Sequence, residues 1–353
     1  MKTASIPIRI RKPSPEDEAG LAAELQKRIV GQPGAIRHIV PYVQMFQAGL
    51  APESRPAGVF LFLGPTGTGK TRTVEALAEA LHGSDKNVLK VDCGEFQMEH
   101  EVAKLIGAPP GYLGHRETQP MLCQQKLGAV TSDRCGLSLV LFDEIEKAAP
   151  SLTRLLLGIL DKAILRLGDN TAVNFERSLI FLTSNLGARS MMKELRPDFG
   201  FQAGMPAPAG DLTRKLESIG LTAMRRKFTP EFVNRIDVVT TFLPLSEESL
   251  ESILELELNE LQRHIDARLA ERGFDLKVST GARAFLLRKG ASPEFGAREL
   301  KRTIHRHLTQ PLATLVAEGK VEPDSAVEVV LDARGDALVV RTKDGQQASA
   351  AAA

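Results

Sequence analysis

The stretch VFLFLGPTGTGKT, residues 59–71, decides the fold of this chain. Residues 59–63 form a continuous apolar run ending at Gly64, which is typical of a strand buried inside a parallel sheet. The loop that follows fits the pattern G-x-x-x-x-G-K-[ST], and TRTVEALAEALHG at 71–83 predicts a helix that Gly83 ends. A glycine-rich loop between a buried strand and a helix is the arrangement that binds a polyphosphate through backbone N–H groups.

The residues of this loop are therefore candidates for contact with a nucleotide. Lys70 would reach the β- and γ-phosphates, and the hydroxyl of Thr71 would bind Mg²⁺. A glycine-rich turn without a ligand is the alternative, which the flanking strand and helix disfavour. The sequence thus predicts binding of ATP and Mg²⁺. The predicted contacts are Gly64, Pro65, Thr66, Gly67, Thr68, Gly69, Lys70 and Thr71.

Further buried strands are expected along the next part of the chain. The candidates are NVLKVDC (87–93), LSLVLFDE (137–144) and RSLIFLTSN (177–185), with helical segments between them. Alternation of buried strands and helices predicts an α/β fold with a parallel sheet covered by helices on both faces.

Polar side chains end two of these predicted strands. Asp143 and Glu144 follow an apolar run, and the carboxyl ends of parallel strands face the crevice in which such sheets bind ligands. We expect Asp143 to help hold Mg²⁺ and Glu144 to activate the attacking water. Asn185 would touch the γ-phosphate or the water; the alternative is a polar strand end that only caps the next helix.

The chain after Pro244 predicts a second, smaller domain of α+β type. Ser246 would cap a long helix with a leucine-rich stripe, which Gly273 would end. A strand at 274–278, two helices and a terminal hairpin would follow. The expected organisation is an extended N-terminal arm (1–20), a nucleotide-binding domain (21–243), a small lid domain (244–343) and a disordered tail (344–353).

Composition narrows the class of protein. The 353 residues are 43% hydrophobic and 25% charged, as in ordinary globular proteins, and the net charge of +1 gives no support for nucleic-acid binding. No apolar run reaches the ~20 residues of a membrane span, and no secretory signal is recognisable. The three cysteines lack metal-binding spacing, so we expect a reduced, cytoplasmic protein. The charge balance and the lack of a long apolar run predict that it has no nucleic-acid or membrane partner.

The segment GYLG, residues 111–114, places an aromatic residue between glycines after two prolines. The chain has only two tyrosines and no tryptophan, so Tyr112 is a distinctive exposed ring on a loop. If several copies formed a ring, these side chains would line a shared channel and grip another polypeptide.

With these motifs in order, residues 20–340 closely resemble the Clp family of AAA+ ATPases, specifically the second ATPase module of the heat-shock disaggregases. The fold this resemblance implies is the AAA+ P-loop fold with a lid domain, and the activity is ATP hydrolysis. The motifs that carry the resemblance are IVGQ (29–32), LIGAPPGYLG (105–114), LVLFDEIEKAAP (139–150), TSNLG (183–187), KFTPEFVNRID (227–237) and SPEFGARELKR (292–302).

The resemblance also implies roles for residues that patterns alone leave as ordinary apolar or ion-paired side chains. Ile29 and Val30 would flank the adenine. Arg235 would be the arginine finger supplied to a neighbouring subunit, and Arg298 would be a sensor of its own subunit's phosphates. Such a finger requires a homo-oligomeric ring, usually of six subunits in this family. Tyr112 and Leu113 would contact the polypeptide substrate.

The chain departs from the family in segments 115–136 and 161–175, near the expected channel. In addition, Phe199, Gly200 and Phe201 resemble the tripeptide with which protease-coupled Clp ATPases dock on a peptidase; an apolar loop anchor is the alternative.

The sequence therefore predicts an ATP-dependent protein unfoldase or remodelling chaperone that threads polypeptides through a single ring. The alternatives are the ATPase subunit of a Clp-type compartmental protease and a nucleotide-switched assembly factor for one complex. A nucleic-acid motor is disfavoured by the balanced charge and the aromatic loop.

Overall fold

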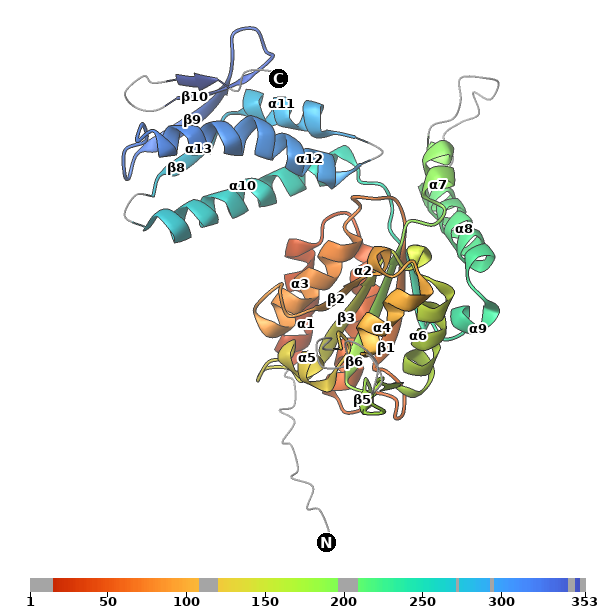
Figure 1. Ribbon diagram of the computed structural model, residues 1–353. Coiled ribbons are helices and arrows are strands. Elements are labelled where there is room, and N and C mark those ends of the chain that lie inside the picture. Colours follow the sequence, from red (N-terminus) through yellow and green to blue (C-terminus); the bar gives the residue numbers. More distant parts are fainter. Residues whose placement is uncertain are drawn as a thin grey trace, which may run out of the picture. The chain divides into compact units, whose positions relative to one another are not determined.

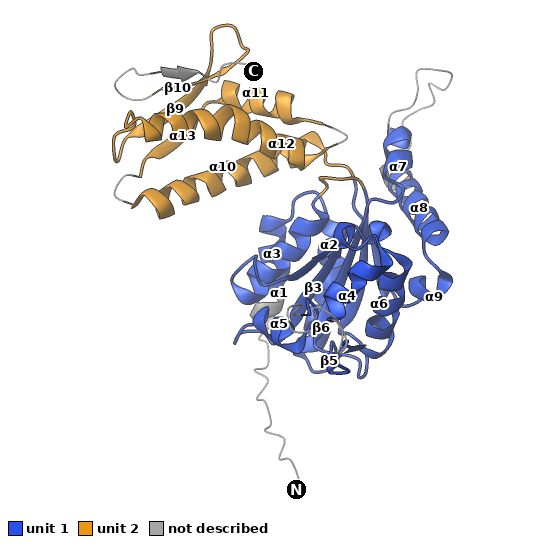
Figure 2. Ribbon diagram, in the orientation of Figure 1, with its two compact units in different colours: residues 1–64, 69–243 blue, residues 65–68, 244–353 orange. Residues whose placement is uncertain are grey.

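The computed structural model describes residues 15–107, 120–195, 209–270, 273–292, 295–341 and 347–349. The chain divides into two compact units, coloured separately in Figure 2. The first unit comprises residues 1–64 and 69–243, and the second comprises residues 65–68 and 244–353.

A five-stranded parallel sheet forms the centre of the first unit (Figure 1), as the sequence predicts. Its strand order is β2-β3-β6-β1-β7, so β1 lies between β6 and β7. Every residue of β1 and β6 is buried, which explains why these strands are apolar without alternation. The strands are β1 (Gly58–Leu63), β2 (Leu89–Asp92), β3 (Ser138–Asp143), β6 (Ser178–Ser184) and β7 (Val238–Thr241).

Helices cover both faces of this sheet, because successive side chains of a strand point to opposite sides. Leu61 of β1 belongs to one apolar cluster and Phe60 to another. The cluster around Phe60 includes residues of α1, α2 and α3, whereas the cluster around Leu61 includes residues of α6, α8 and α9. The helices are α1 (Pro15–Arg28), α2 (Pro33–Gln47), α3 (Lys70–His82), α4 (Ala103–Ile106), α5 (Gln124–Ala129), α6 (Pro150–Lys162), α7 (Ala188–Leu195), α8 (Ala209–Lys227) and α9 (Pro230–Val233).

The helix predicted after the glycine-rich loop is α3. It begins at Lys70, directly after Gly69 with φ 99°, and it ends at His82, directly before Gly83, which has a left-handed backbone conformation. A glycine therefore flanks each end of the helix, in a backbone conformation that other residues rarely adopt.

The structure corrects the prediction of an extended arm over residues 1–20. Helix α1 begins at Pro15, so residues 15–20 are helical, while residues 1–14 lie outside the described part. Proline is favoured at the first position of a helix, and the acidic residues 16–18 suit the positive end of its dipole. Pro15 and the acidic residues after it therefore belong to a helix start and not to an extended arm.

The second unit is α+β, as predicted. Ser246 caps α10 and accepts a hydrogen bond from the N–H of Ser249 at 3.2 Å. A four-stranded sheet in the order β11-β10-β9-β8 shares an apolar cluster with the helices. A π-helical turn at 305–309 separates α12 from α13. The elements are α10 (Glu247–Leu269), β8 (Asp275–Val278), α11 (Thr280–Gly290), α12 (Ala297–Ile304), α13 (Gln310–Ala317), β9 (Ala326–Leu331), β10 (Leu338–Arg341) and β11 (Gln347–Ser349).

Two expectations for this unit differ from the structure. Helix α10 ends at Leu269, before the predicted stop at Gly273. The expected disordered tail, 344–353, contains strand β11, whose residues Gln347–Ser349 pair antiparallel with β10. The exposed edge of β10 explains the difference, because it offers unpaired backbone groups to a following strand.

Candidate nucleotide site

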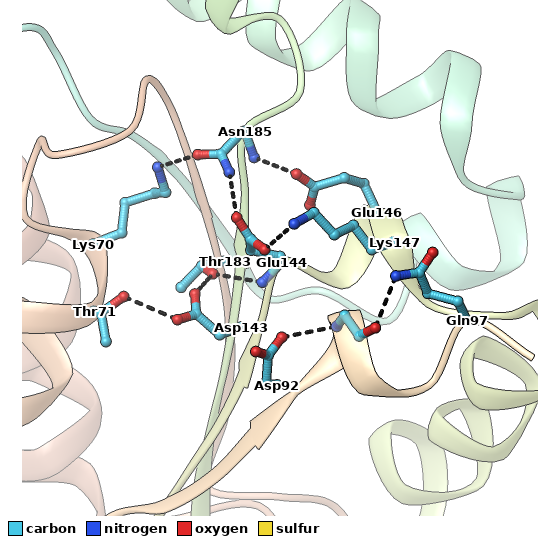
Figure 3. Close-up of polar contacts among 11 residues, drawn as sticks. Lys70, Thr71, Asp92, Gln97, Asp143, Glu144, Glu146, Lys147, Thr183 and Asn185 are labelled. Carbon is cyan, nitrogen blue, oxygen red and sulfur yellow. Dashed lines mark hydrogen bonds and ion pairs between the residues drawn. The ribbon is translucent and has the colours of Figure 1, made fainter. Parts of the chain in front are cut away.

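Three of the predicted catalytic residues, Lys70, Glu144 and Asn185, meet at one edge of the parallel sheet (Figure 3). Asp143 is the last residue of β3, Ser184 is the last residue of β6, and Gly64 follows β1. Leu63 of β1 is in register with Ser184. The parallel topology thus brings the glycine-rich loop, the acidic pair and Asn185 together, although they are far apart in the sequence.

The glycine-rich loop has the backbone geometry that its sequence predicts. Gly64, Gly67 and Gly69 all have positive φ values, of 146°, 76° and 99°. Such turns direct successive N–H groups toward one concavity, which is how loops of this kind bind phosphate. Within the loop, the hydroxyl of Thr68 donates to the carbonyl oxygen of Pro65 at 2.9 Å.

Lys70 is buried, with 8% of its surface exposed. Its ammonium group donates to the carbonyl oxygen of Gly64 at 2.7 Å and to Oδ1 of Asn185 at 2.9 Å. A buried ammonium group requires such partners. These contacts hold the Lys70 ammonium group between Gly64, at the start of the loop, and Asn185.

Asp143 is held between two hydroxyl groups. Thr71 Oγ1 donates to Asp143 Oδ2 at 3.2 Å, and Thr183 Oγ1 donates to the other carboxylate oxygen. Mg²⁺ in nucleotide sites is bound by one or two protein oxygens together with phosphates and waters. The adjacent oxygens of Thr71 and Asp143 therefore fit a magnesium ion.

Glu144 adopts a left-handed backbone conformation, with φ 55° and ψ 49°. Its N–H donates to Thr183 Oγ1 at 3.0 Å, which helps to hold this unfavourable geometry. Its carboxylate accepts a hydrogen bond from Asn185 Nδ2 at 3.1 Å and forms an ion pair with Lys147. Strained non-glycine residues of this kind concentrate at functional sites.

Asn185 connects the loop to the acidic pair. Its side chain accepts from Lys70 and donates to Glu144, so it bridges the two (Figure 3). Its backbone N–H donates to Glu146 Oε1 at 2.9 Å. The expectation that Asn185 belongs to the site thus has a geometric basis beyond helix capping.

Cys93 lies near this acidic group but is chemically inert. Burial, and then the negative charges of Asp143 and its neighbours, raise the pKa of the Cys93 thiol far above its usual value. The protonated thiol is therefore the favoured form at neutral pH, which is the less reactive form of cysteine.

Arg235 lies away from these contacts. Its guanidinium donates to the carbonyl oxygen of Glu231 at 3.0 Å, pairs with the Glu231 carboxylate at 3.3 Å and lies 3.5 Å from Asp161 Oδ1. Within the described residues, its Nε is buried and makes no hydrogen bond of regular geometry. The structure therefore pairs Arg235 with carboxylates of its own chain.

The other predicted residues are placed as follows. Ile29 is buried at the junction of α1 and α2, and Val30 is half-buried beside it. Arg298 is an exposed residue in the first turn of α12, in the second unit. The residues predicted to contact substrate or peptidase lie outside the described part: Tyr112, Leu113, Phe199, Gly200 and Phe201.

Sequence reasoning missed several residues that organise the site. Thr183 contacts both acidic residues, Glu146 holds the backbone of Asn185, and Lys147 pairs with Glu144. The motif LVLFDEIEKAAP contains Glu146 and Lys147. The motif alone does not show that these two side chains contact Asn185 and Glu144 at the ends of β6 and β3.

Family profiles match both units. The AAA domain (Cdc48 subfamily) matches residues 55–239, and the C-terminal D2-small domain of the ClpB protein matches residues 245–329. The fold and the site thus define a P-loop ATPase of the AAA+ class. More narrowly, the chain belongs to the Clp family of AAA+ ATPases and is homologous to the second ATPase module of ClpB and Hsp104.

Individual relatives agree with this assignment. The chain is 38% identical over 324 residues to the probable chaperone protein ClpB 1 of Chlorobaculum tepidum, covering 92% of this chain and 70% of the relative. It is 38% identical over 320 residues to ClpB of Corynebacterium diphtheriae, covering 91% of this chain. The chain spans only 34% of that second relative.

Solved structures agree as well. A closed-state Hsp104 structure with ATPyS and FITC casein matches with a TM-score of 0.76 and 27% identity, over 95% of this chain and 54% of that chain. The extended S. cerevisiae Hsp104:casein complex matches with a TM-score of 0.78 and 27% identity, over 94% and 53%. Among the helices of the described residues, none combines the length and apolarity that crossing a membrane requires.

Proposed function

We propose that this chain hydrolyses ATP in order to unfold or remodel polypeptides threaded through a ring of its own copies. The observation that carries the proposal is the bridge made by Asn185 between Lys70 and Glu144. It links the residue expected to hold the phosphates to the residue expected to activate water. A site that only bound nucleotide would not need this coupling.

Each residue has a defined task in this scheme. Lys70 binds the β- and γ-phosphates, and Thr71 with Asp143 would hold Mg²⁺, which neutralises phosphate charge when bound. Glu144 orients a water molecule and accepts its proton. Asn185 contacts the γ-phosphate or the water. Its hydrogen bond to Glu144 fixes the orientation of the Asn185 and Glu144 side chains relative to each other. Ile29 and Val30 would flank the adenine.

The ring supplies the remaining contacts. Arg235 would act on the ATP of the adjacent subunit, which requires a homo-oligomeric ring, with six subunits as the expected number. Arg298 would contact the phosphates of its own subunit. Arg235 is half-exposed beside two carboxylates. It can therefore leave these carboxylates and bind a phosphate, which forms stronger hydrogen bonds with a guanidinium group.

The substrate of this ring would be an unfolded or misfolded polypeptide, gripped by Tyr112 and Leu113. The two Hsp104 structures are titled as containing casein, which makes casein a suitable test substrate. Docking of a Clp-type peptidase through Phe199, Gly200 and Phe201 would turn the same motor into a protease subunit. Unpaired cysteines in the described residues agree with a reducing, cytoplasmic location.

The test combines ATP turnover with substrate trapping. Glu144→Gln should lower kcat by about 100-fold or more while ATP still binds, and it should retain casein in the ATP state. Glu251→Gln, at an exposed glutamate of α10, is the matched control and should behave as the wild type. If Glu144→Gln traps one specific partner protein and not a broad mixture of polypeptides, the chain is better explained as an assembly factor. Unchanged ATP turnover in Glu144→Gln would refute the proposal.

The threading step needs its own variant. Tyr112→Ala should retain ATPase activity but no longer unfold a model substrate, and Tyr112→Phe should retain both activities. Undiminished unfolding by Tyr112→Ala would exclude Tyr112 as the gripping residue.

A further inference from the structure

An open groove of about 480 Å³ lies in the first unit next to the nucleotide site. It is formed by the start of α7 and the end of α8, which pack against each other (Figure 1). Six of its lining residues matter here: Asn185, Gly187, Arg189, Ser190, Arg226 and Lys227.

The groove gathers positive charge. Arg189, Arg226 and Lys227 are exposed, and none of them forms an ion pair with a carboxylate of the described residues. Lys215, on the same helix α8, does have such a partner in Glu194. Like charges that line one concavity repel one another, and an anion bound between them removes this cost. The groove therefore favours an anionic ligand.

The identity of the anion follows from the shared wall of the groove. Asn185 lines it and also bridges Lys70 to Glu144. Since Asn185 is expected to touch the γ-phosphate, the groove begins where hydrolysis leaves its product. We propose that this groove is a binding site for inorganic phosphate on its way out of the nucleotide site. The proposal rests on the proposed ATPase activity.

The chemistry of the lining suits phosphate better than a larger anion. Arginine guanidinium groups present paired N–H donors that match phosphate oxygens, and a lysine ammonium adds a point charge. The hydroxyl of Ser190 and the positive end of the α7 dipole supply further donors at the same place. The groove has room for a hydrated phosphate. Its apolar lining residues are Leu186, Ala188 and Ala223, and none of the described residues that line it is aromatic and could stack on a base.

Binding can be measured while the glycine-rich loop is occupied. Protein saturated with ADP would be titrated with inorganic phosphate by calorimetry. The double variant Arg226→Gln, Lys227→Gln should bind phosphate about tenfold more weakly than the wild type. Arg225→Gln is the matched control, since Arg225 is exposed on the same helix but does not line the groove. It should bind phosphate as the wild type does.

The possible outcomes separate the alternatives. ADP affinity should be equal in all these proteins, which also reports that the variants are folded. Phosphate binding that is absent in the ADP-loaded wild type, unaltered in the double variant, or equally weakened in Arg225→Gln would overturn the groove site. Unaltered phosphate binding with weakened ring assembly in sedimentation would instead assign the groove to acidic residues of a second copy. Failure of the wild type to bind ADP would overturn the nucleotide function itself.

Discussion

Arg235 forms an ion pair with Asp161 of its own chain, with Nε 3.5 Å from Oδ1. Asp161 lies in the last turn of α6, immediately before the short antiparallel strands β4 (Ile164–Arg166) and β5 (Ala172–Asn174). An arginine that acts on a neighbouring subunit must leave this carboxylate first. The contact therefore links the proposed finger to segment 161–175, which departs from the family pattern.

Asp161→Asn should make Arg235 easier to transfer to a neighbour, because it removes a competing negative charge while conserving size. The ion pair is partly exposed, so its loss is worth ~0.2–1 kcal/mol and the effect is modest. The protein concentration that gives half-maximal ATPase activity should fall by a factor of about 1.4 to 5. In an Arg235→Ala background the same substitution should change nothing, and an equal shift there would refute the coupling.

Asp143→Asn should raise the Mg²⁺ concentration required for half-maximal ATPase activity by about tenfold or more, because the neutral amide is a poorer magnesium ligand. Asp92→Asn is the matched control. Asp92 is in register with Asp143 on the adjacent strand, but its carboxylate accepts the N–H of Gly94 at 2.8 Å. If both variants shift the Mg²⁺ requirement equally, Asp143 has no special role. ATP binding in the presence of EDTA should be nearly unchanged.

Lys147→Met should lower kcat about three- to tenfold with little change in the KM for ATP, because Lys147 steadies the Glu144 carboxylate rather than the nucleotide. Hydrogen bonding to Glu144 and its negative charge raise the pKa of Lys147, so the residue stays charged throughout the neutral range. Lys147→Arg should restore most of the rate. Failure of arginine to rescue, or a rise in KM alone, would argue against this role.

The sequence was informative about the fold where burial is complete. Strands β1, β3 and β6 are apolar on both faces because helices cover both sides, so continuous apolar runs located them within a residue or two. The predicted arm over residues 1–20 is wrong at its C-terminal end. The alternation of Ile6, Ile8 and Ile10 favours an extended segment, but Pro15 and the acidic residues after it start a helix. Strand β11 was missed because its pairing depends on a neighbouring edge, not on its own composition.

The site was predictable in its residues and less so in its contacts. Lys70, Thr71, Asp143, Glu144 and Asn185 all meet, because parallel strands end at one edge of the sheet. The left-handed conformation of Glu144 has no sequence signal, since it is not a glycine. It depends on tertiary contacts that no local pattern encodes.

Gly64→Ala should destabilise the first unit by about 2–4 kcal/mol. Gly64 has φ 146°, and an added Cβ would lie 2.3 Å from the carbonyl oxygen of Phe242. Gly34→Ala is the matched control, because Gly34 lies in α2 with open space around its Cβ position. That variant should be neutral or slightly stabilising, since alanine is the better helix former. Urea denaturation of both variants checks the prediction, and equal stabilities would contradict it.

His82 should make the first unit less stable as the pH falls below neutrality. The side chain is 9% exposed, and its Nδ1 lies 3.0 Å from Ser132 Oγ. Burial lowers the pKa of His82 from its ordinary value of 6.5, outweighing the opposing effect of the Leu137 backbone. Because the folded protein then binds its proton less readily than the unfolded chain, this contribution to stability is complete above pH 6.5. It is lost as the pH falls from there through the folded pKa.

Urea unfolding at pH 7.5 and at pH 5.5 measures this effect. The loss of stability between the two pH values should be smaller in His82→Gln than in the wild type. His100→Gln is the matched control at an exposed histidine of the same unit, and it should lose as much stability as the wild type. An unchanged pH dependence in His82→Gln would assign the acid sensitivity to other groups.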